Sequence, residues 1–301
     1  MQKFYSHGKL LLTGEYVVLD GAMALAAPTK RGQSLEIASN DHNGLHWTSI
    51  DDQNLVWFRT EIQIEDGAFK SDVKTDLVLE RLVQILNAAN SLNSEFAGIA
   101  KGCDARALLE FPRAWGLGSS STLINNIAAW AKVNPYKLLE LTFGGSGYDI
   151  ACANQDGPLV YQREGSSHTV SATAFDPIFK EHLYFVYLNK KQNSQDAISQ
   201  YKTLQVDQKQ ISEVNVITNK WIDCKDLSSF MTLIDAHEKL LSSILNISPI
   251  KALHFSDFKG SIKSLGAWGG DFILAASIDD PRSYFRSKGF DVILPYSDMI
   301  L

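Results

Sequence analysis

Residues 112–121 read Pro-Arg-Ala-Trp-Gly-Leu-Gly-Ser-Ser-Ser, and they separate a strand-like run, residues 105–111, from a stretch with apolar residues at helical spacing that ends near residue 132. Glycines allow a backbone to approach a ligand closely. A helix that begins at the serines would direct its free N–H groups, and the positive end of its dipole, into the loop. The serine hydroxyls can donate to phosphate oxygens or ligate Mg²⁺. This strand–loop–helix segment therefore predicts an anion site, and phosphate is the usual anion.

The loop at residues 112–121 fits neither of the two commonest nucleotide-binding motifs. No Gly-Lys-Ser/Thr follows four residues after a glycine, so the loop is not a Walker A motif. The third glycine of the dinucleotide fingerprint is missing, and no early βαβ unit surrounds the loop. An isolated Gly-x-Gly-Ser-Ser is more often a capped helix after a glycine turn, so this motif alone leaves nucleotide binding open.

The rest of the chain mixes strand and helix patterns without strict βαβ alternation, which favours an α+β fold over a doubly wound sheet. Helical spacing of apolar residues, or a polar helical composition, occurs over residues 75–92, 135–144, 194–222 and 226–246. Strand patterns occur over residues 9–12, 16–19, 34–37, 182–188, 261–265 and 272–278. The second of these runs is closed by Asp20-Gly21, which predicts a hairpin. The apolar run at 182–188 predicts a strand that is covered on both faces or lies centrally in its sheet.

Composition and charge limit the possible partners and the compartment. The chain has 301 residues, 45% hydrophobic and 21% charged, with a formal net charge of -6. This length predicts two domains, residues 1–165 and 166–301. The acidic balance argues against a nucleic-acid partner. The lack of a long apolar run or a secretory signal, together with three scattered cysteines, predicts a cytoplasmic protein without a membrane partner, a disulfide framework or a thiolate metal site.

Four segments resemble the motifs of the GHMP kinases, named for galactokinase, homoserine kinase, mevalonate kinase and phosphomevalonate kinase. Residues 6–21 are similar to the opening Pro-Gly-Lys-x-x-x-x-Gly-Glu stretch of that family, with His7 in place of the proline. Residues 112–121 resemble its Pro-x-x-x-Gly-Leu-Gly-Ser-Ser loop, and residues 263–271 its Gly-Ala-Gly-Gly-Gly loop. Residues 146–151 resemble the segment that carries the catalytic aspartate in the mevalonate and phosphomevalonate branches. The resemblance covers nearly the whole chain.

The resemblance implies a fold and a reaction. The fold would be the two-domain α+β fold of GHMP kinases, with an N-terminal domain like the second domain of ribosomal protein S5 and a ferredoxin-like C-terminal domain. ATP and Mg²⁺ would be the cofactors. A monomer or homodimer would transfer the γ-phosphoryl group to mevalonate, phosphomevalonate or a similar small acid, which would be its small-molecule acceptor.

The resemblance also implies residue roles. Asp149 would be the general base, and Lys9 would keep its carboxylate ionised and acidify the acceptor hydroxyl. The nucleotide would be bound by Pro112, Gly116, Leu117, Gly118, Ser119, Ser120 and Ser121. Ser120 would also be the metal ligand. The substrate would be contacted by Glu15, Ser146, Gly147, Gly266 and Ala267.

Each role has an alternative that the residues leave open. Asp149 can be the N-cap of a short helix, and Lys9 a solvent-facing lysine at a strand edge. Trp268 replaces a glycine of the third motif, and it can stack on a base or fill space. Leu138 stands at the spacing of the metal-binding glutamate in the mevalonate branch, with Glu140 two residues away. A decarboxylase of the same fold and a catalytically silent metabolite-binding relative are the alternative functions.

Overall fold

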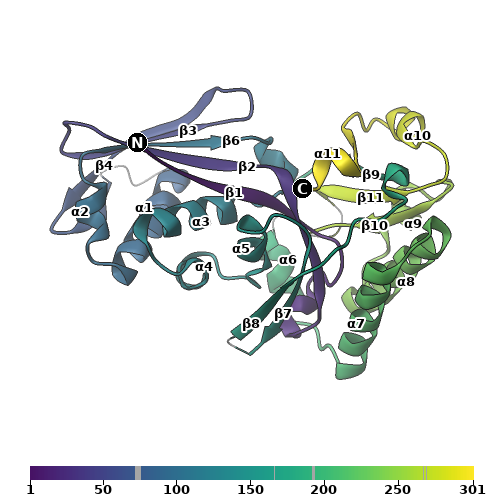
Figure 1. Ribbon diagram of the computed structural model, residues 1–301. Helices are drawn as coiled ribbons and strands as arrows, with labels where there is room; N and C mark the ends of the chain where they lie inside the picture. Colours follow the sequence, from purple (N-terminus) through teal and green to yellow (C-terminus); the bar gives the residue numbers. More distant parts are fainter. Residues whose placement is uncertain (72–75, 166, 192–193, 267, 269) are drawn as a thin grey trace. The chain divides into compact units, whose positions relative to one another are not determined.

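The computed structural model describes residues 1–71, 76–165, 167–191, 194–266, 268 and 270–301 (Figure 1). Two compact units account for the chain. Unit 1 consists of Met1–Gly8, Arg31–Arg113 and Gly118–Asn154, and unit 2 consists of Lys9–Lys30, Ala114–Leu117 and Gln155–Leu301. Strands β1 (Gln2–Leu11) and β2 (Ala24–Ser39) contribute residues to both units, so neither unit is one continuous stretch. The boundary predicted between residues 165 and 166 falls inside the range of unit 2.

Unit 1 is a sheet with helices packed on it. The strand order is β5-β4-β3-β6-β2, in which β3 and β6 are parallel and the other pairs are antiparallel. These strands are β3 (Gly44–Ile50), β4 (Val56–Glu65), β5 (Ala68–Lys70) and β6 (Cys103–Leu109). The helices are α1 (Leu77–Leu92), α2 (Phe96–Ala100), α3 (Ser119–Ala131), α4 (Pro135–Thr142) and α5 (Tyr148–Ala153). Every second residue of β6 is buried, as a strand with one covered face requires, and Cys103, Ala105 and Ala107 share a core cluster with the helices.

The helix predicted over residues 75–92 is observed as α1. Residue 75 lies outside the described residues, and Asp76 caps the helix by accepting hydrogen bonds from the N–H groups of Val78 and Leu79. The buried stripe of this helix is Leu79, Leu82, Ile85, Leu86 and Ala89. Those residues join Trp47 and Trp130 in the core of unit 1. The amphipathic pattern therefore identified both the helix and its buried face.

Unit 2 contains a four-stranded antiparallel sheet with the order β10-β11-β9-β12. Its strands are β9 (Leu183–Tyr187), β10 (Ser261–Ser264), β11 (Phe272–Ala276) and β12 (Ile293–Pro295). Strand β9 lies between β11 and β12, which confirms the central position predicted from its apolar run. The remaining strands, β7 (Leu159–Glu164) and β8 (Ser167–Ala172), extend from residues 24–26 of β2.

Helices α7 (Gln208–Asp223) and α8 (Leu227–Leu245) lie side by side in unit 2 (Figure 1). The polar stretch predicted as one helix, residues 194–222, is divided into α6 (Ser194–Tyr201) and α7. Asp207 and Gln210 form a reciprocal capping box that starts α7. The other helices of this unit are α9 (Ile250–His254), α10 (Arg282–Ser287) and α11 (Tyr296–Met299).

The hairpin predicted at residues 16–21 is wrong. Val17–Asp20 forms one turn of 3₁₀ helix, entered through Tyr16 with φ 64° and closed by Gly21 with φ 92°. The reason is burial: this turn places the adjacent side chains of Val17 and Val18 both in the interior. An extended strand would have sent them to opposite faces.

Within the described residues, no helix combines the length and the apolar character that a bilayer crossing needs.

Candidate functional site

The glycine–serine loop has the local structure that its sequence predicts. Gly116 and Gly118 have φ values of 67° and 87°, in the left-handed region that favours glycine. Gly118 is the N-cap of α3, and as glycine it supplies no capping side chain. The first turn of α3 presents N–H groups that no side-chain cap satisfies, which is the arrangement that suits an anion.

Lys9 holds the part of this loop that belongs to unit 2. Its backbone N–H donates to the carbonyl of Leu117 at 3.0 Å, and its Nζ donates to the carbonyl of Gly116 at 3.3 Å. The side chain is half-buried rather than directed to solvent at a strand edge. The ring of Trp115 packs edge-on against Phe272 with centroids 5.4 Å apart. The loop is thus fixed from both the first motif and strand β11.

A buried charge cluster connects the first and third motifs within unit 2. The ammonium of Lys263 donates to the Glu15 carboxylate and lies 3.2 Å from Oε1 of Glu238. Ser264 donates its N–H and its hydroxyl to Glu238 at 3.0 and 2.9 Å. The side chain of Lys263 is 0% exposed and that of Glu15 is 1% exposed. One buried ammonium therefore pairs with two buried carboxylates. Removing any of the three groups would destabilise the fold, because a buried charge would be left without its partner.

His237 lies beside this cluster and is neutral. Burial, followed by the charge of Lys263, lowers its pKa well below the usual value. Nε2 accepts a hydrogen bond from the N–H of Gly14 at 3.2 Å, so the ring proton is on Nδ1. Nδ1 of His237 and Oε2 of Glu15 are buried without a hydrogen-bond partner among the described residues. His237 is completely buried, as a core residue is.

Burial raises the pKa of Glu15 to about 7, and the nearby Lys263 ammonium opposes this shift without cancelling it. The charge of Glu238 adds to the rise. Burial likewise raises the pKa of Glu238, with Lys263 again opposing it. The carboxylate of Glu15 thus has its partner inside the protein, and its contact with a substrate stays a prediction.

The stability of the protein should therefore depend on pH through Glu15. A carboxyl whose pKa rises from 4.5 to about 7 on folding favours the folded state fully below pH 4.5, and this contribution is lost as pH rises through 7. Relative to Glu15→Gln, the wild type should lose unfolding free energy over that window, with a slope of at most about 1.4 kcal/mol per pH unit. Urea unfolding at a series of pH values measures this difference.

The exposed Glu80, changed to Gln, is the matched control and should show no such slope relative to wild type. A difference between wild type and Glu15→Gln that stays constant from pH 4.5 to 8 would contradict the assignment.

Asp149 lies in the first turn of α5 in unit 1 and is half-buried. The N-cap of this helix is Gly147, with φ 94°, so the interpretation of Asp149 as the N-cap is wrong. Ser146 directly precedes that cap, and Ile150 is fully buried. Asp149 and Lys9 belong to different units, so their proximity stays a prediction.

The other positions that the resemblance singled out differ in how far they are buried. Leu138 is a fully buried core residue of α4, whereas Glu140 is exposed on the same helix. Gly266 has φ 64° and is partly exposed, and Ala267 lies outside the described residues. The described residues contain no group of three or more His, Cys, Asp or Glu side chains arranged to hold a metal ion. Metal ligation by Ser120 stays a prediction.

Trp268 fills the core of unit 2. It is 7% exposed and packs in one apolar cluster with Val17 and Leu241, and its backbone N–H donates to the hydroxyl of Tyr16 at 3.2 Å. An indole in this place cannot stack on a nucleotide base without leaving the core. The bulky residue at a glycine position of the third motif thus has a packing explanation.

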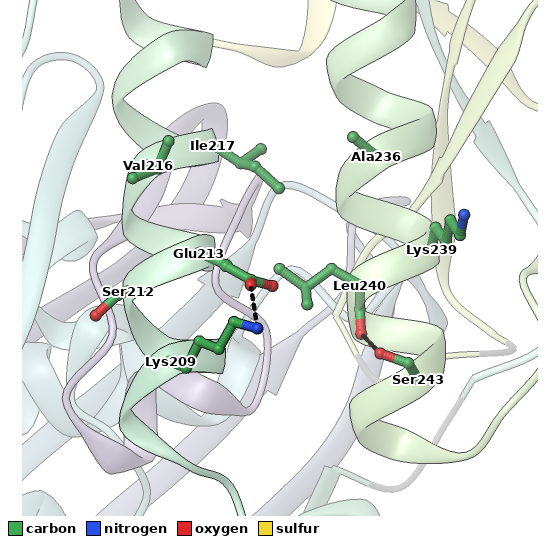
Figure 2. Close-up of a pocket in the computed structure, with 9 residues that line it drawn as sticks. All are labelled: Lys209, Ser212, Glu213, Val216, Ile217, Ala236, Lys239, Leu240 and Ser243. Carbon is green, nitrogen blue, oxygen red and sulfur yellow. Dashed lines mark hydrogen bonds and ion pairs between the residues drawn. The ribbon is translucent and has the colours of Figure 1, made fainter.

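A groove of about 560 Å³ runs between α7 and α8 (Figure 2). Leu240 and Ile217 point into the space between the helices, and Lys239 points away from it. At one end, Lys209 and Glu213 pair at 3.9 Å. None of the predicted site residues lines this groove.

The third motif begins at Lys263 and ends at Asp271, and neither residue has a role predicted from the sequence. All four residues of β10 are buried, so Lys263 is a charged residue inside an apolar strand. That signal is visible in the sequence, because a lysine flanked by buried strand positions needs a partner.

Comparison with known proteins places the fold. No family model matches the chain, and no curated protein matches it in a sequence search. Solved structures do match. The mevalonate kinase of Methanococcus jannaschii is 14% identical, with a TM-score of 0.69, over 97% of this chain and 96% of that one. The Streptococcus pneumoniae phosphomevalonate kinase, in complex with phosphomevalonate and AMPPNP, is 16% identical, with a TM-score of 0.68, over 96% and 95%.

A third match, Lactococcus lactis galactokinase complexed with galactose, is 14% identical, with a TM-score of 0.65, over 95% of this chain and 88% of that one. All three structures are GHMP kinases. The chain therefore has the two-domain α+β fold of the GHMP small-molecule kinases, which confirms the fold predicted from the four motifs. These kinases act on different acceptors, so the fold leaves the acceptor open.

Proposed function

We propose that the protein is an ATP-dependent small-molecule kinase that transfers the γ-phosphoryl group to mevalonate, phosphomevalonate or a similar small acid. The observation that carries this proposal is the N-terminus of α3, which no side chain caps and which follows two glycines in the left-handed conformation. The first of these glycines, Gly116, accepts a hydrogen bond from the Lys9 ammonium. Backbone N–H groups at such a terminus bind phosphate oxygens, and a kinase needs little more from its protein than positioning and charge stabilisation.

Different residues bind the phosphates, the metal ion and the acceptor in this proposal. The N–H groups and hydroxyls of Ser119, Ser120 and Ser121 hold the phosphates. Mg²⁺, with Ser120 as its ligand, neutralises charge on the phosphates when bound. Asp149 accepts the proton of the acceptor hydroxyl. The positive charge of Lys9 favours the ionised forms of the Asp149 carboxyl and of the acceptor hydroxyl. Ser146 and Gly147, next to Asp149, support a mevalonate-type acceptor because this Ser-Gly-x-Asp pattern belongs to that branch.

Binding of Mg-ATP should raise the thermal stability, because a ligand that binds only the folded state shifts the unfolding equilibrium. At a nucleotide concentration 100-fold above Kd, the gain is about 2.7 kcal/mol. Gly118→Val should abolish the shift, since its side chain would occupy the space in front of the α3 N–H groups. Differential scanning fluorimetry with and without Mg-ATP measures both results.

Gly98→Val is the control, because a side chain at Gly98 meets open space. It should keep the full shift. A shift that survives in Gly118→Val would place the nucleotide elsewhere.

The acceptor and the reaction class are tested together. ATP consumption is measured against a panel of small alcohols and acids, with CO₂ detected in parallel. ADP formation with a phosphorylated product supports a kinase. Release of CO₂ with ADP would indicate a decarboxylase, and ligand-induced stabilisation without turnover would indicate a silent metabolite-binding relative.

A further inference from the structure

Asp271, the last residue of the third motif, is held in a fixed place in unit 2. Its φ is 53°, in the left-handed region. Its N–H donates to the carbonyl of Lys190 at 2.7 Å, and its carbonyl accepts from the N–H of Leu188 at 2.8 Å. The residue is 8% exposed. Two backbone hydrogen bonds and near-complete burial leave the side chain little freedom.

The carboxylate of Asp271 lies against the phosphate loop. A Cβ built on Gly116 would meet Cγ of Asp271 at 2.4 Å and its two oxygens at 2.5 and 2.7 Å. A Cβ built on Gly266 would lie 3.5 Å from Oδ2. The carboxylate thus occupies the space that a side chain at Gly116 would need, between a glycine of the loop and a glycine of the third motif.

This placement puts a negative charge beside a loop predicted to bind negative phosphates. The same charge affects two neighbouring tyrosines. Burial raises the pKa of Tyr16 and of Tyr187, and the charge of Asp271 adds to each rise. A carboxylate and a triphosphate repel each other unless a cation lies between them. Mg²⁺ prefers oxygen ligands and is usually held by one or two carboxylates together with substrate phosphates. A carboxylate at this position fits that role.

We propose that Asp271 makes nucleotide binding at this loop depend on Mg²⁺. Its carboxylate faces the cation that accompanies the triphosphate, directly or through a water molecule, and it disfavours nucleotide that arrives without the cation. The inference rests on the proposed function, because it requires a nucleoside triphosphate at the loop. A bracing role for Asp271 against Gly116 is the alternative.

The variant Asp271→Asn separates the two roles. Asparagine has nearly the same shape and tolerates the left-handed backbone, so a brace would survive the change. The affinity for ATP is measured by calorimetry on the full-length protein, once with Mg²⁺ and once with excess EDTA. Wild type should bind Mg-ATP at least about 10-fold more tightly than free ATP, and Asp271→Asn should reduce that ratio to about threefold or less. Free ATP should gain affinity in the variant while Mg-ATP loses it.

Asp66→Asn is the matched control, because Asp66 also has φ 53° but lies in an exposed turn of unit 1. It should keep the wild-type ratio. If Asp271→Asn proves unfolded by circular dichroism, Asp271→Gly removes the carboxylate and suits the same backbone conformation.

The outcomes distinguish this proposal from the proposed function. If a folded Asp271→Asn variant binds Mg-ATP and free ATP with wild-type affinity, Asp271 only supports the loop at Gly116. This result would overturn the Asp271 proposal and leave the proposed function intact. A wild type that binds ATP equally well with and without Mg²⁺ would also overturn the Asp271 proposal alone. A wild type that binds neither form would overturn the proposed function and this inference with it.

Discussion

Lys263→Met is expected to lower the free energy of unfolding by about 3–5 kcal/mol, because removing one partner of a buried ion pair leaves an uncompensated charge. In this protein the loss affects two carboxylates, Glu15 and Glu238, which share the Lys263 ammonium. Methionine keeps the length and the apolar stem of the lysine, so packing changes little. Urea unfolding at pH 7 measures the loss.

The double variant Lys263→Met/Glu15→Gln tests the cause. It removes a cation and an anion together, while Glu238 keeps its hydrogen bonds from Ser264. Much of the lost stability should return, since Glu15 is then neutral. Lys209→Met, at a lysine whose side chain is 84% exposed, should stay within about 0.5 kcal/mol of wild type. If Lys263→Met cost no more than this control, the buried ammonium would contribute nothing to stability.

The sequence predicted the elements whose signal is local. The helices α1 and α8 were predicted from the helical spacing of their apolar residues, because each buries one face. The central strand β9 was predicted from its continuous apolar run. The loop before α3 was also predicted correctly, since glycines at residues 116 and 118 permit its two left-handed positions. Order and spacing of the four motifs then led to the fold that the solved structures confirm.

Tertiary partners could not be predicted in the same way. Glu15 and Lys263 are 248 residues apart, and nothing near either residue indicates the other. The turn at Val17–Asp20 has strand-forming residues, but burial of Val17 and Val18 determines its conformation. The discontinuity of the two units has the same origin, because β1 and β2 are long enough to contribute to both. These features depend on contacts between distant segments, which a single sequence does not encode locally.

Asp149→Asn should lower the rate of phosphoryl transfer by about 10²–10⁴-fold, because asparagine keeps the size and hydrogen bonding of aspartate but cannot accept the proton of the acceptor. Nucleotide affinity should survive, since Asp149 lies in α5 and the N–H groups expected to bind phosphate lie in the loop and α3. Single-turnover transfer with saturating acceptor, measured beside an ATP titration, gives both quantities. Asp156→Asn, at an exposed bend after α5, is the matched control and should transfer at the wild-type rate.

Lys9→Met supplies the second half of this test. Its backbone hydrogen bond to Leu117 remains, whereas the contact of its ammonium with the carbonyl of Gly116 is lost. If Lys9 and Asp149 act as a unit on the acceptor hydroxyl, the double variant should be little slower than the slower single variant. Multiplied rate losses would instead assign Lys9 to the loop and Asp149 to the acceptor. Near-full transfer by Asp149→Asn would remove the general base from the mechanism, and loss of nucleotide binding in that variant would make Asp149 a metal ligand or a structural residue.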